Sequence, residues 1–115
     1  MIKKPEEMKI QNIEKLRDGK GTTKMTHLFT PDELKGHCRV CAIIELQPGC
    51  SIGFHEHIDE EEIYFILKGK GLVNDNGNEQ EVTVGDAVLT GDGAGHSIEN
   101  TGDEPLVLMA VVLTY

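Results

Sequence analysis

The sequence has no tryptophan, and aromatic residues make up only 4% of its 115 residues. Its core must therefore be built from Val, Ile, Leu and Ala side chains. Basic residues are also scarce, with 11 Lys and Arg against 20 Asp and Glu, which gives a net charge of −9. Nucleic acids and anionic membranes are bound through clustered Lys and Arg. We therefore expect neither of them as a partner.

Long apolar segments are absent as well. The longest one, from Leu106 to Leu113, is far shorter than the ~20 residues that a membrane-spanning helix needs. Lys3 and Lys4 are not followed by the apolar region of a signal peptide. Three cysteines, an odd number, do not suggest a disulfide framework in a chain of this size. We expect a soluble, cytoplasmic protein of one domain.

Thirteen glycines and four prolines divide the sequence into short segments. Glycine-containing turns such as Asp75-Asn76-Gly77 separate them. Short strands between turns of this kind are typical of an all-β sandwich or barrel. The predicted strands cover residues 24–30, 38–46, 62–68, 71–74, 80–84, 86–90 and 106–113.

The N-terminal segment carries the only helical signal. Ile10, Ile13 and Leu16 follow one another at intervals of three residues. Because this stretch is short, a turn of helix and an extended N-terminal arm fit it equally well. We assign residues 1–25 to an N-terminal arm and residues 26–115 to a β-barrel domain.

The strand predicted at 62–68 has apolar side chains on both faces. Successive strand residues point to opposite sides of a sheet. Glu62, Tyr64 and Ile66 therefore share the face that we take as inner, and Phe65 lies with its neighbours Ile63 and Leu67 on the other. A strand that is apolar on both sides is covered on both sides. Since a small barrel has one interior, we expect the second face to form a homodimer interface.

Four residues form a candidate metal site. His55 and His57 are two apart, so on a strand both imidazoles project from one face toward the same ion. Glu62 begins the inner face of the following strand and can complete the site, whereas Glu61 should point away. His96 follows a glycine-rich loop and can supply a fourth ligand from another strand. A His-x-His pair alone is often surface histidine, but the addition of a glutamate and a third histidine favours a metal.

Other candidate residues carry weaker signals. We consider Tyr64, Ile66 and Met109, together with His27, as residues that could line a pocket beside the metal. Arg39 could bind an anion, but a solvent or interface position fits its neighbours better.

The three cysteines could also suggest zinc or redox chemistry, because Cys38 and Cys41 form a CxxC pair. Their positions have opposite parity on a strand, so they should point to opposite faces and simply pack there. A turn position accounts for Cys50.

Two motifs make the sequence resemble the cupin family. The first is Gly49-x5-His55-x-His57-x4-Glu62-x6-Gly69. The second is Gly85-x5-Gly91-x-Gly93-x2-His96-x3-Asn100, in which Gly91 stands where the family usually has proline. The resemblance implies a double-stranded β-helix, or jelly roll, that is usually a homodimer and holds metal through His55, His57, Glu62 and His96. The sequence is most similar to small one-domain cupins described as oxalate-decarboxylase-like.

The donor set also limits the chemistry. Three imidazole nitrogens and one carboxylate suit a divalent Mn, Fe, Co, Ni, Cu or Zn ion better than Mg or Ca. We expect one such ion per chain and a small-molecule ligand. Our first hypothesis is a metal-dependent enzyme, of decarboxylase or dioxygenase type, acting on a small carboxylic acid or enediol. The alternative is a non-catalytic module that binds or senses a small molecule or a metal. A sugar-phosphate isomerase is disfavoured because the sequence offers no basic cluster for phosphate.

Overall fold

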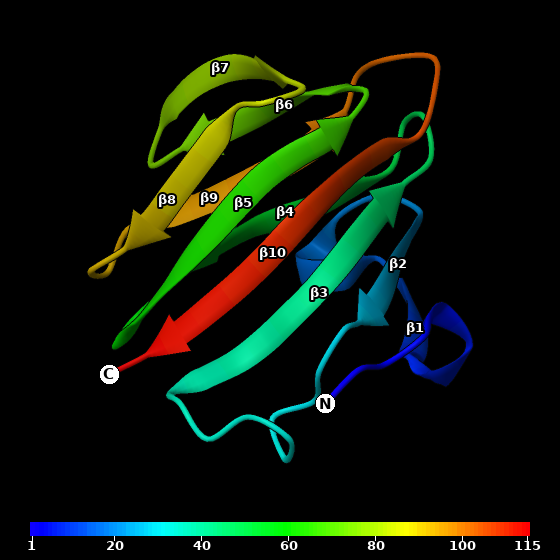
Figure 1. Cartoon of the computed structure of the whole chain (residues 1–115). Helices are drawn as coiled ribbons and strands as arrows, with labels where there is room; N and C mark the ends of the chain where they lie inside the picture. The colour runs from blue at the N-terminus through cyan, green and yellow to red at the C-terminus, as the bar shows by residue number, and fades with distance from the viewer.

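The computed structural model describes residues 1–115 and consists almost entirely of β-strands (Figure 1). This confirms the all-β prediction. The ten strands are β1 (Lys9–Glu14), β2 (Thr22–His27), β3 (Cys38–Leu46), β4 (Ser51–Glu56), β5 (Glu60–Lys68), β6 (Lys70–Asp75), β7 (Asn78–Thr83), β8 (Ala87–Gly91), β9 (Gly95–Asn100) and β10 (Leu106–Thr114). Two single 3₁₀ turns, η1 (Pro5–Glu7) and η2 (Leu16–Asp18), complete the secondary structure. No helix is long and apolar enough to span a membrane.

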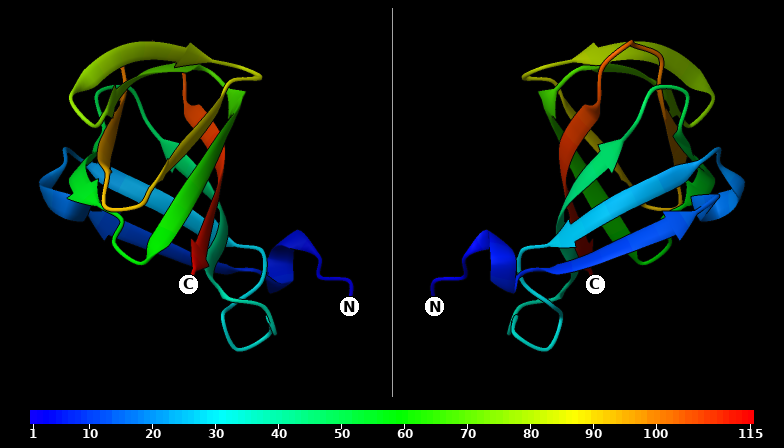
Figure 2. Two further views of the ribbon diagram at one scale, coloured as in Figure 1. Left: turned by 90° about the vertical axis from the view of Figure 1, so that its left-hand side faces the viewer. Right: turned by 90° about the vertical axis from the view of Figure 1, so that its right-hand side faces the viewer.

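The strands form two antiparallel sheets that face each other in a jelly roll (Figure 2). The larger sheet has the order β1-β2-β3-β10-β5-β8, and the smaller one has the order β4-β9-β6-β7. One apolar core lies between them. Its residues are Met25, Ala42, Ile44, Leu46, Ile52, Tyr64, Ile66, Val73, Val82, Ile98, Leu106, Leu108 and Ala110. As the composition predicted, all but Met25 and Tyr64 are Val, Ile, Leu or Ala.

The two sheets do not close into a barrel, which corrects our expectation. Six strands face four, and no backbone ladder joins one sheet to the other at either edge. The sheets are instead held together by the side chains between them. The structure is therefore an open sandwich with the jelly-roll strand order.

The N-terminal segment belongs to the larger sheet. β1 pairs with β2, and β2 pairs with β3. The periodicity of Ile10 and Ile13 does not mark a helix, because Ile13 packs on the core whereas Ile10 is 52% exposed. A tight turn follows, in which Lys15, Arg17 and Asp18 have positive φ angles of 50°, 54° and 62°. That left-handed backbone cannot continue a right-handed helix.

Alternation along β5 follows the predicted register. Glu62, Tyr64 and Ile66 are buried, while Phe65 and Leu67 are each 42% exposed. β10 alternates in the same way, with its even-numbered residues 106 to 112 buried. The larger sheet therefore has one face in the core and one apolar face turned outward.

A β-bulge in β3 changes the expected direction of two cysteines. Val112 pairs with Val40, but the next residue of β10, Leu113, pairs with Cys38, so Arg39 is an extra residue in the ladder. Cys41 pairs with Val111 on the outer face. Because the bulge shifts the alternation by one residue, Cys38 lies on that outer face too. The expectation that the two cysteines point to opposite faces was wrong, and both are free thiols.

Candidate metal centre

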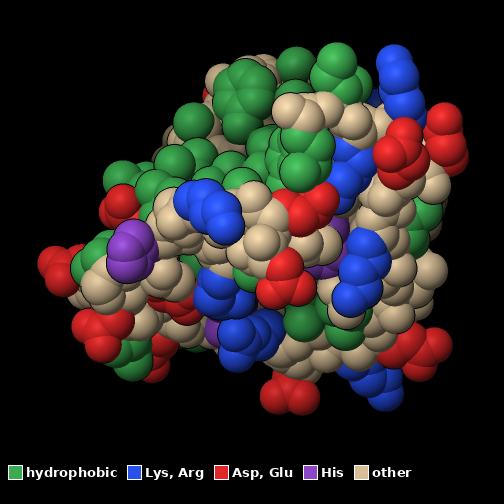
Figure 3. Space-filling model, turned by 60° about the horizontal axis from the view of Figure 1, so that its bottom comes forward, with side chains coloured by type: hydrophobic (Ala, Val, Ile, Leu, Met, Phe, Trp, Pro, Cys, Tyr) green, Lys and Arg blue, Asp and Glu red, His purple; other side chains and the backbone are tan.

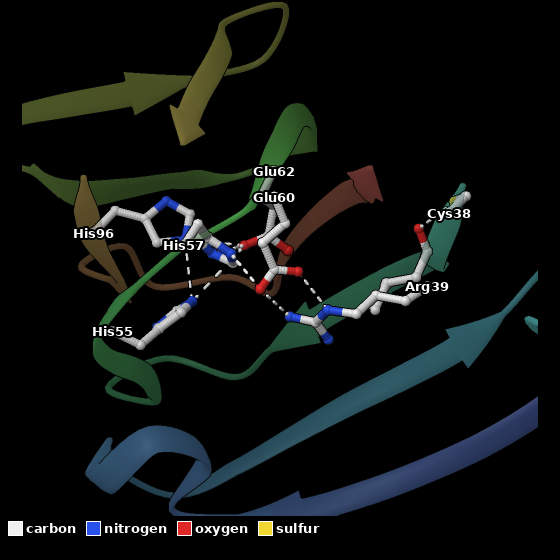
Figure 4. A network of polar contacts seen from close by, with 8 residues as sticks. Cys38, Arg39, His55, His57, Glu60, Glu62 and His96 are labelled. Carbon is white, nitrogen blue, oxygen red and sulfur yellow. Dashed lines mark hydrogen bonds and ion pairs between the residues drawn. The ribbon is translucent and has the colours of Figure 1, made fainter. Parts of the chain in front are cut away.

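Four side chains converge between the two sheets (Figure 4). His55 comes from β4, His57 directly follows it, Glu62 comes from β5 and His96 from β9. The Nε2 atom of His96 lies 3.1 Å from Nε2 of His55 and 3.1 Å from Nε2 of His57. Oε1 of Glu62 lies 2.9 Å from Nε2 of His96 and 3.0 Å from Nε2 of His57. All four ligand atoms lie within 4.8 Å of one another.

A second β-bulge directs the side chain of His55 toward the other three side chains of the cluster. Ile52 pairs with Ile98 and His55 pairs with His96. Between these two pairs β4 advances by three residues and β9 by two, so β4 contains one extra residue. The extra residue brings both Ile52 and His55 to the inner face, which strict alternation would not allow. Nδ1 of His55 lies 2.7 Å from the carbonyl oxygen of Gly53. A carbonyl only accepts hydrogen bonds, so Nδ1–H donates, and the Nε2 lone pair faces the cluster.

The bulge depends on a close approach between two glycines. A Cβ atom on Gly53 would overlap the carbonyl of Arg17, and one on Gly19 would overlap the carbonyl of Ser51. Only glycine lets the turn around η2 lie directly on β4. The position of His55 is therefore tied to the backbone of this turn.

His57 lies beyond the end of its strand and is held by the loop before β9. Its N–H donates to the carbonyl of Ala94 over 3.0 Å, and its carbonyl accepts from the N–H of Gly93 over 2.9 Å. Gly91, where the cupin resemblance leads one to expect proline, ends β8 beside Glu61. A Cβ atom there would lie 2.5 Å from Cβ of Glu61, so close packing on β5 accounts for the glycine.

Polar residues also extend the site behind His57. Oε1 of Glu60 lies 3.4 Å from Nδ1 of His57. The same carboxylate accepts two hydrogen bonds from the guanidinium of Arg39, one from Nε and one from Nη2, the latter over 2.9 Å. Arg39 lowers the pKa of Glu60, and Glu60 raises the pKa of Arg39, so both groups are ionised. A carboxylate behind a histidine fixes its ring orientation and makes its other nitrogen a better metal ligand.

The charges in the cluster favour an ionised glutamate. Burial alone would raise the pKa of Glu62, but the contacts with the three histidines outweigh it and hold that pKa well below its usual range. The contact with Glu62 raises the pKa of His57, against the effect of burial. Burial lowers the pKa of His96. The site thus holds one fixed negative charge surrounded by imidazoles.

These residues fit a metal ion. Two ligand atoms bound at about 2.1 Å and at a right angle lie about 3.0 Å apart, close to four of the separations given above. His55 and Glu62 are more widely separated, at 3.8 Å. In addition, Nδ1 of His96 is buried and has no hydrogen-bond partner, and the buried Nδ1 of His57 has only its 3.4 Å contact with Glu60. Both rings can then carry their proton on Nδ1 and turn the Nε2 lone pair inward, where a cation would relieve the repulsion.

A cavity of about 110 Å³ opens beside the cluster. His55, His57, Glu62 and Tyr64 line it, and the Tyr64 ring stacks on His96 at a centroid distance of 4.8 Å. Burial raises the pKa of Tyr64, and Glu62 adds to this effect. The Tyr64 hydroxyl therefore stays protonated.

The other residues proposed to line the pocket lie elsewhere. Ile66 is on the same face but deeper in the core and does not reach the cavity. Met109 must be removed from the set, because it lies beside Phe65 on the outer face of the sheet. The side chain of His27 is hydrogen-bonded to the side chain of Gln11 and lies in a separate surface hollow.

The sequence analysis missed one cavity residue, Arg17, and placed another, Arg39, at a solvent or interface position. Arg17 and Arg39 both line the cavity. Arg39 is directed there by the bulge in β3, and Arg17 comes from the N-terminal turn. Neither lies in a metal-ligand motif, and only the bulge and the turn geometry bring them to the site.

Comparison with known proteins decides the family. The model of the cupin domain matches residues 42–112, which contain all four clustered side chains. The chain belongs to the cupin family. An oxalate-binding protein from Thermotoga maritima is 39% identical over 113 residues, which cover 98% of this chain and 93% of that relative.

Two further comparisons extend this result. The crystal structure of a predicted oxalate decarboxylase from Thermotoga maritima matches with a TM-score of 0.94 and 38% identity, and the match covers 100% of both chains. An uncharacterised protein from Methanocaldococcus jannaschii is 32% identical over 93 residues, or 81% of this cupin and 72% of that protein. The cupin jelly roll is thus established for this chain.

A pair of neighbouring glutamates tests the metal site. Glu62→Gln removes the negative charge from the ligand atom. It should lower the metal affinity roughly tenfold or more, which is the usual loss when a group that supports a metal site is removed. Glu61→Gln is the matched control and should bind metal nearly as the wild type does. Metal content after loading with one equivalent of Zn²⁺ and gel filtration measures both. Equal loss in the two variants, or loss only with Glu61→Gln, would contradict the assignment.

Proposed function

We propose that this cupin holds one divalent transition-metal ion through His55, His57, Glu62 and His96 and binds a small carboxylate in the adjoining cavity. The convergence of three Nε2 atoms and one carboxylate oxygen is the observation that carries the proposal. When bound, such an ion supplies Lewis-acid charge to a chelating oxygen ligand. Mn, Fe, Co, Ni, Cu and Zn all suit these donors.

The cavity supports a small anionic ligand in particular. Its volume of about 110 Å³ is well below the ~300 Å³ at which pockets for drug-sized molecules begin. Two arginines line it, although the whole chain carries a net charge of −9. The names of the Thermotoga maritima proteins, oxalate-binding protein and predicted oxalate decarboxylase, point to a ligand of the same class.

Binding and turnover are separate proposals for this site. The cavity residues bind, orient and shield the ligand: Tyr64 offers a protonated hydroxyl, and apolar residues such as Ile44 and Val112 exclude water. These roles suffice for a binding module. A decarboxylase or dioxygenase is the second candidate, supported by the name of the structural relative alone.

Titration with oxalate tests the proposal. We expect protein loaded with Co²⁺ to bind oxalate in isothermal titration calorimetry, and metal-free protein to bind it at least ~100-fold more weakly, because chelation to the ion supplies most of the attraction. His96→Ala should behave like metal-free protein. Release of CO₂ from the bound oxalate would indicate a decarboxylase, and its absence a binding module. Equal affinity with and without metal would contradict the proposal.

We also propose that the protein is a homodimer through the outer face of the larger sheet. The strand register places Ile63 between Leu89 and Val111, and Phe65 beside Met109. Figure 3 shows a continuous green area of hydrophobic side chains on one side of the molecule. An apolar surface of this kind marks an interaction site, and a two-fold axis would let two identical faces cover each other.

One charged substitution in this face should dissociate the dimer. Phe65→Glu would bury an unpaired carboxylate at a cost of several kcal/mol, which raises the dimer dissociation constant by about 100-fold or more. Val84→Glu alters an apolar residue that is 58% exposed outside this face and is the control. Sedimentation velocity at micromolar concentration measures both variants. A monomeric wild type would contradict the dimer.

A further inference from the structure

Arg17 differs from the other arginine of the cavity in having no partner. Arg39 is occupied by two contacts with Glu60. Arg17 makes no ion pair with any carboxylate of the chain. It nevertheless lines the same small cavity as His55, His57 and Glu62. An exposed arginine that lines the cavity and lacks an internal anion is free to bind an anionic ligand there.

The backbone holds Arg17 in an unfavourable conformation at this place. Its φ and ψ angles are 54° and 38°, in the left-handed region that disfavours residues other than glycine. Glycine would fit the turn better, yet the position carries the longest cationic side chain. Strained conformations of this kind gather at ligand-binding sites, where the surrounding structure holds them. Here the packing of Gly19 and Gly53 holds the turn.

The charges around the cavity match a dianion. A divalent ion, the carboxylate of Glu62 and the free guanidinium of Arg17 leave two positive charges, since Arg39 and Glu60 neutralise each other. A small dicarboxylate supplies the two negative charges. It can use one oxygen of each carboxylate for the ion and present the remaining oxygens to a guanidinium fork.

We infer that Arg17 is a specificity-determining residue that selects short dicarboxylates over monocarboxylates of similar size. The inference rests on the proposed metal-dependent binding of a carboxylate. To that proposal the inference adds the identity of the residue that recognises the second carboxylate. The ligand class follows from the free guanidinium, the two excess charges and the small cavity.

Arg17→Gly separates recognition from folding. Glycine removes the guanidinium and relieves the left-handed backbone, so the variant should melt at the same temperature as the wild type or higher. Lys15→Gly is the matched control: its φ of 50° is similar, and its side chain does not line the cavity. Arg17→Lys keeps the charge but loses the fork, and should give an intermediate loss. All variants should load Co²⁺ as the wild type does.

Calorimetry with Co²⁺-loaded protein compares oxalate with glycolate, a chelating monoanion of similar size. Arg17→Gly should weaken oxalate binding by about tenfold or more, the usual effect of losing a hydrogen bond to a charged group. Glycolate affinity should change by less than about threefold, and Lys15→Gly should affect neither ligand. Unchanged oxalate binding by Arg17→Gly, or equal losses for both ligands, would overturn the inference. If the loaded wild type bound neither ligand, the proposed function itself would fail.

Discussion

Four electron-rich atoms are held within 4.8 Å of one another inside an apolar sandwich, and the rest of the structure is arranged around this concentration of lone pairs. The side chain of His96 is fully buried, and those of His57 and Glu62 are 2% and 8% exposed. Water cannot relieve their mutual repulsion there as it does at a surface. A cation between them would satisfy all four at once. The cluster is thus arranged, in a core of aliphatic residues, as the binding of a metal ion would require.

Departures from regular β-structure direct the side chains of this site. Ideal strands would bring Ile52 or His55 to the inner face, but not both, and the bulge in β4 removes that conflict. The bulge in β3 similarly brings Arg39 to the cavity and shifts the alternation of Cys38 before it. The turn that carries Arg17 packs on the first bulge through Gly19 and Gly53. The four clustered side chains, the two arginines that line the cavity and the backbone irregularities thus form one connected unit.

Much of this organisation could be predicted from the sequence, because buried and exposed residues alternate in β5 from Glu62 to Leu67. The register of Glu62 and Tyr64 and the all-β class follow from local patterns, and the grouping of the four candidate ligands follows from the spacing of the two motifs. The orientation of Cys38 could not be predicted, since one extra residue at Arg39 reverses the parity. Strand β1 was missed because the spacing of Ile10 and Ile13 imitates a helix. Arg17 reaches the cavity through a left-handed turn, which periodicity does not describe.

X-ray absorption at the metal edge of protein loaded with one equivalent of Zn²⁺ tests the central claim most directly. The fine structure counts imidazole ligands through the scattering of the outer ring atoms. We predict three imidazoles and at least one oxygen at about 2.0–2.2 Å, with no sulfur. A spectrum with one or no imidazole, or with sulfur scattering at about 2.3 Å from the free cysteines, would contradict the account.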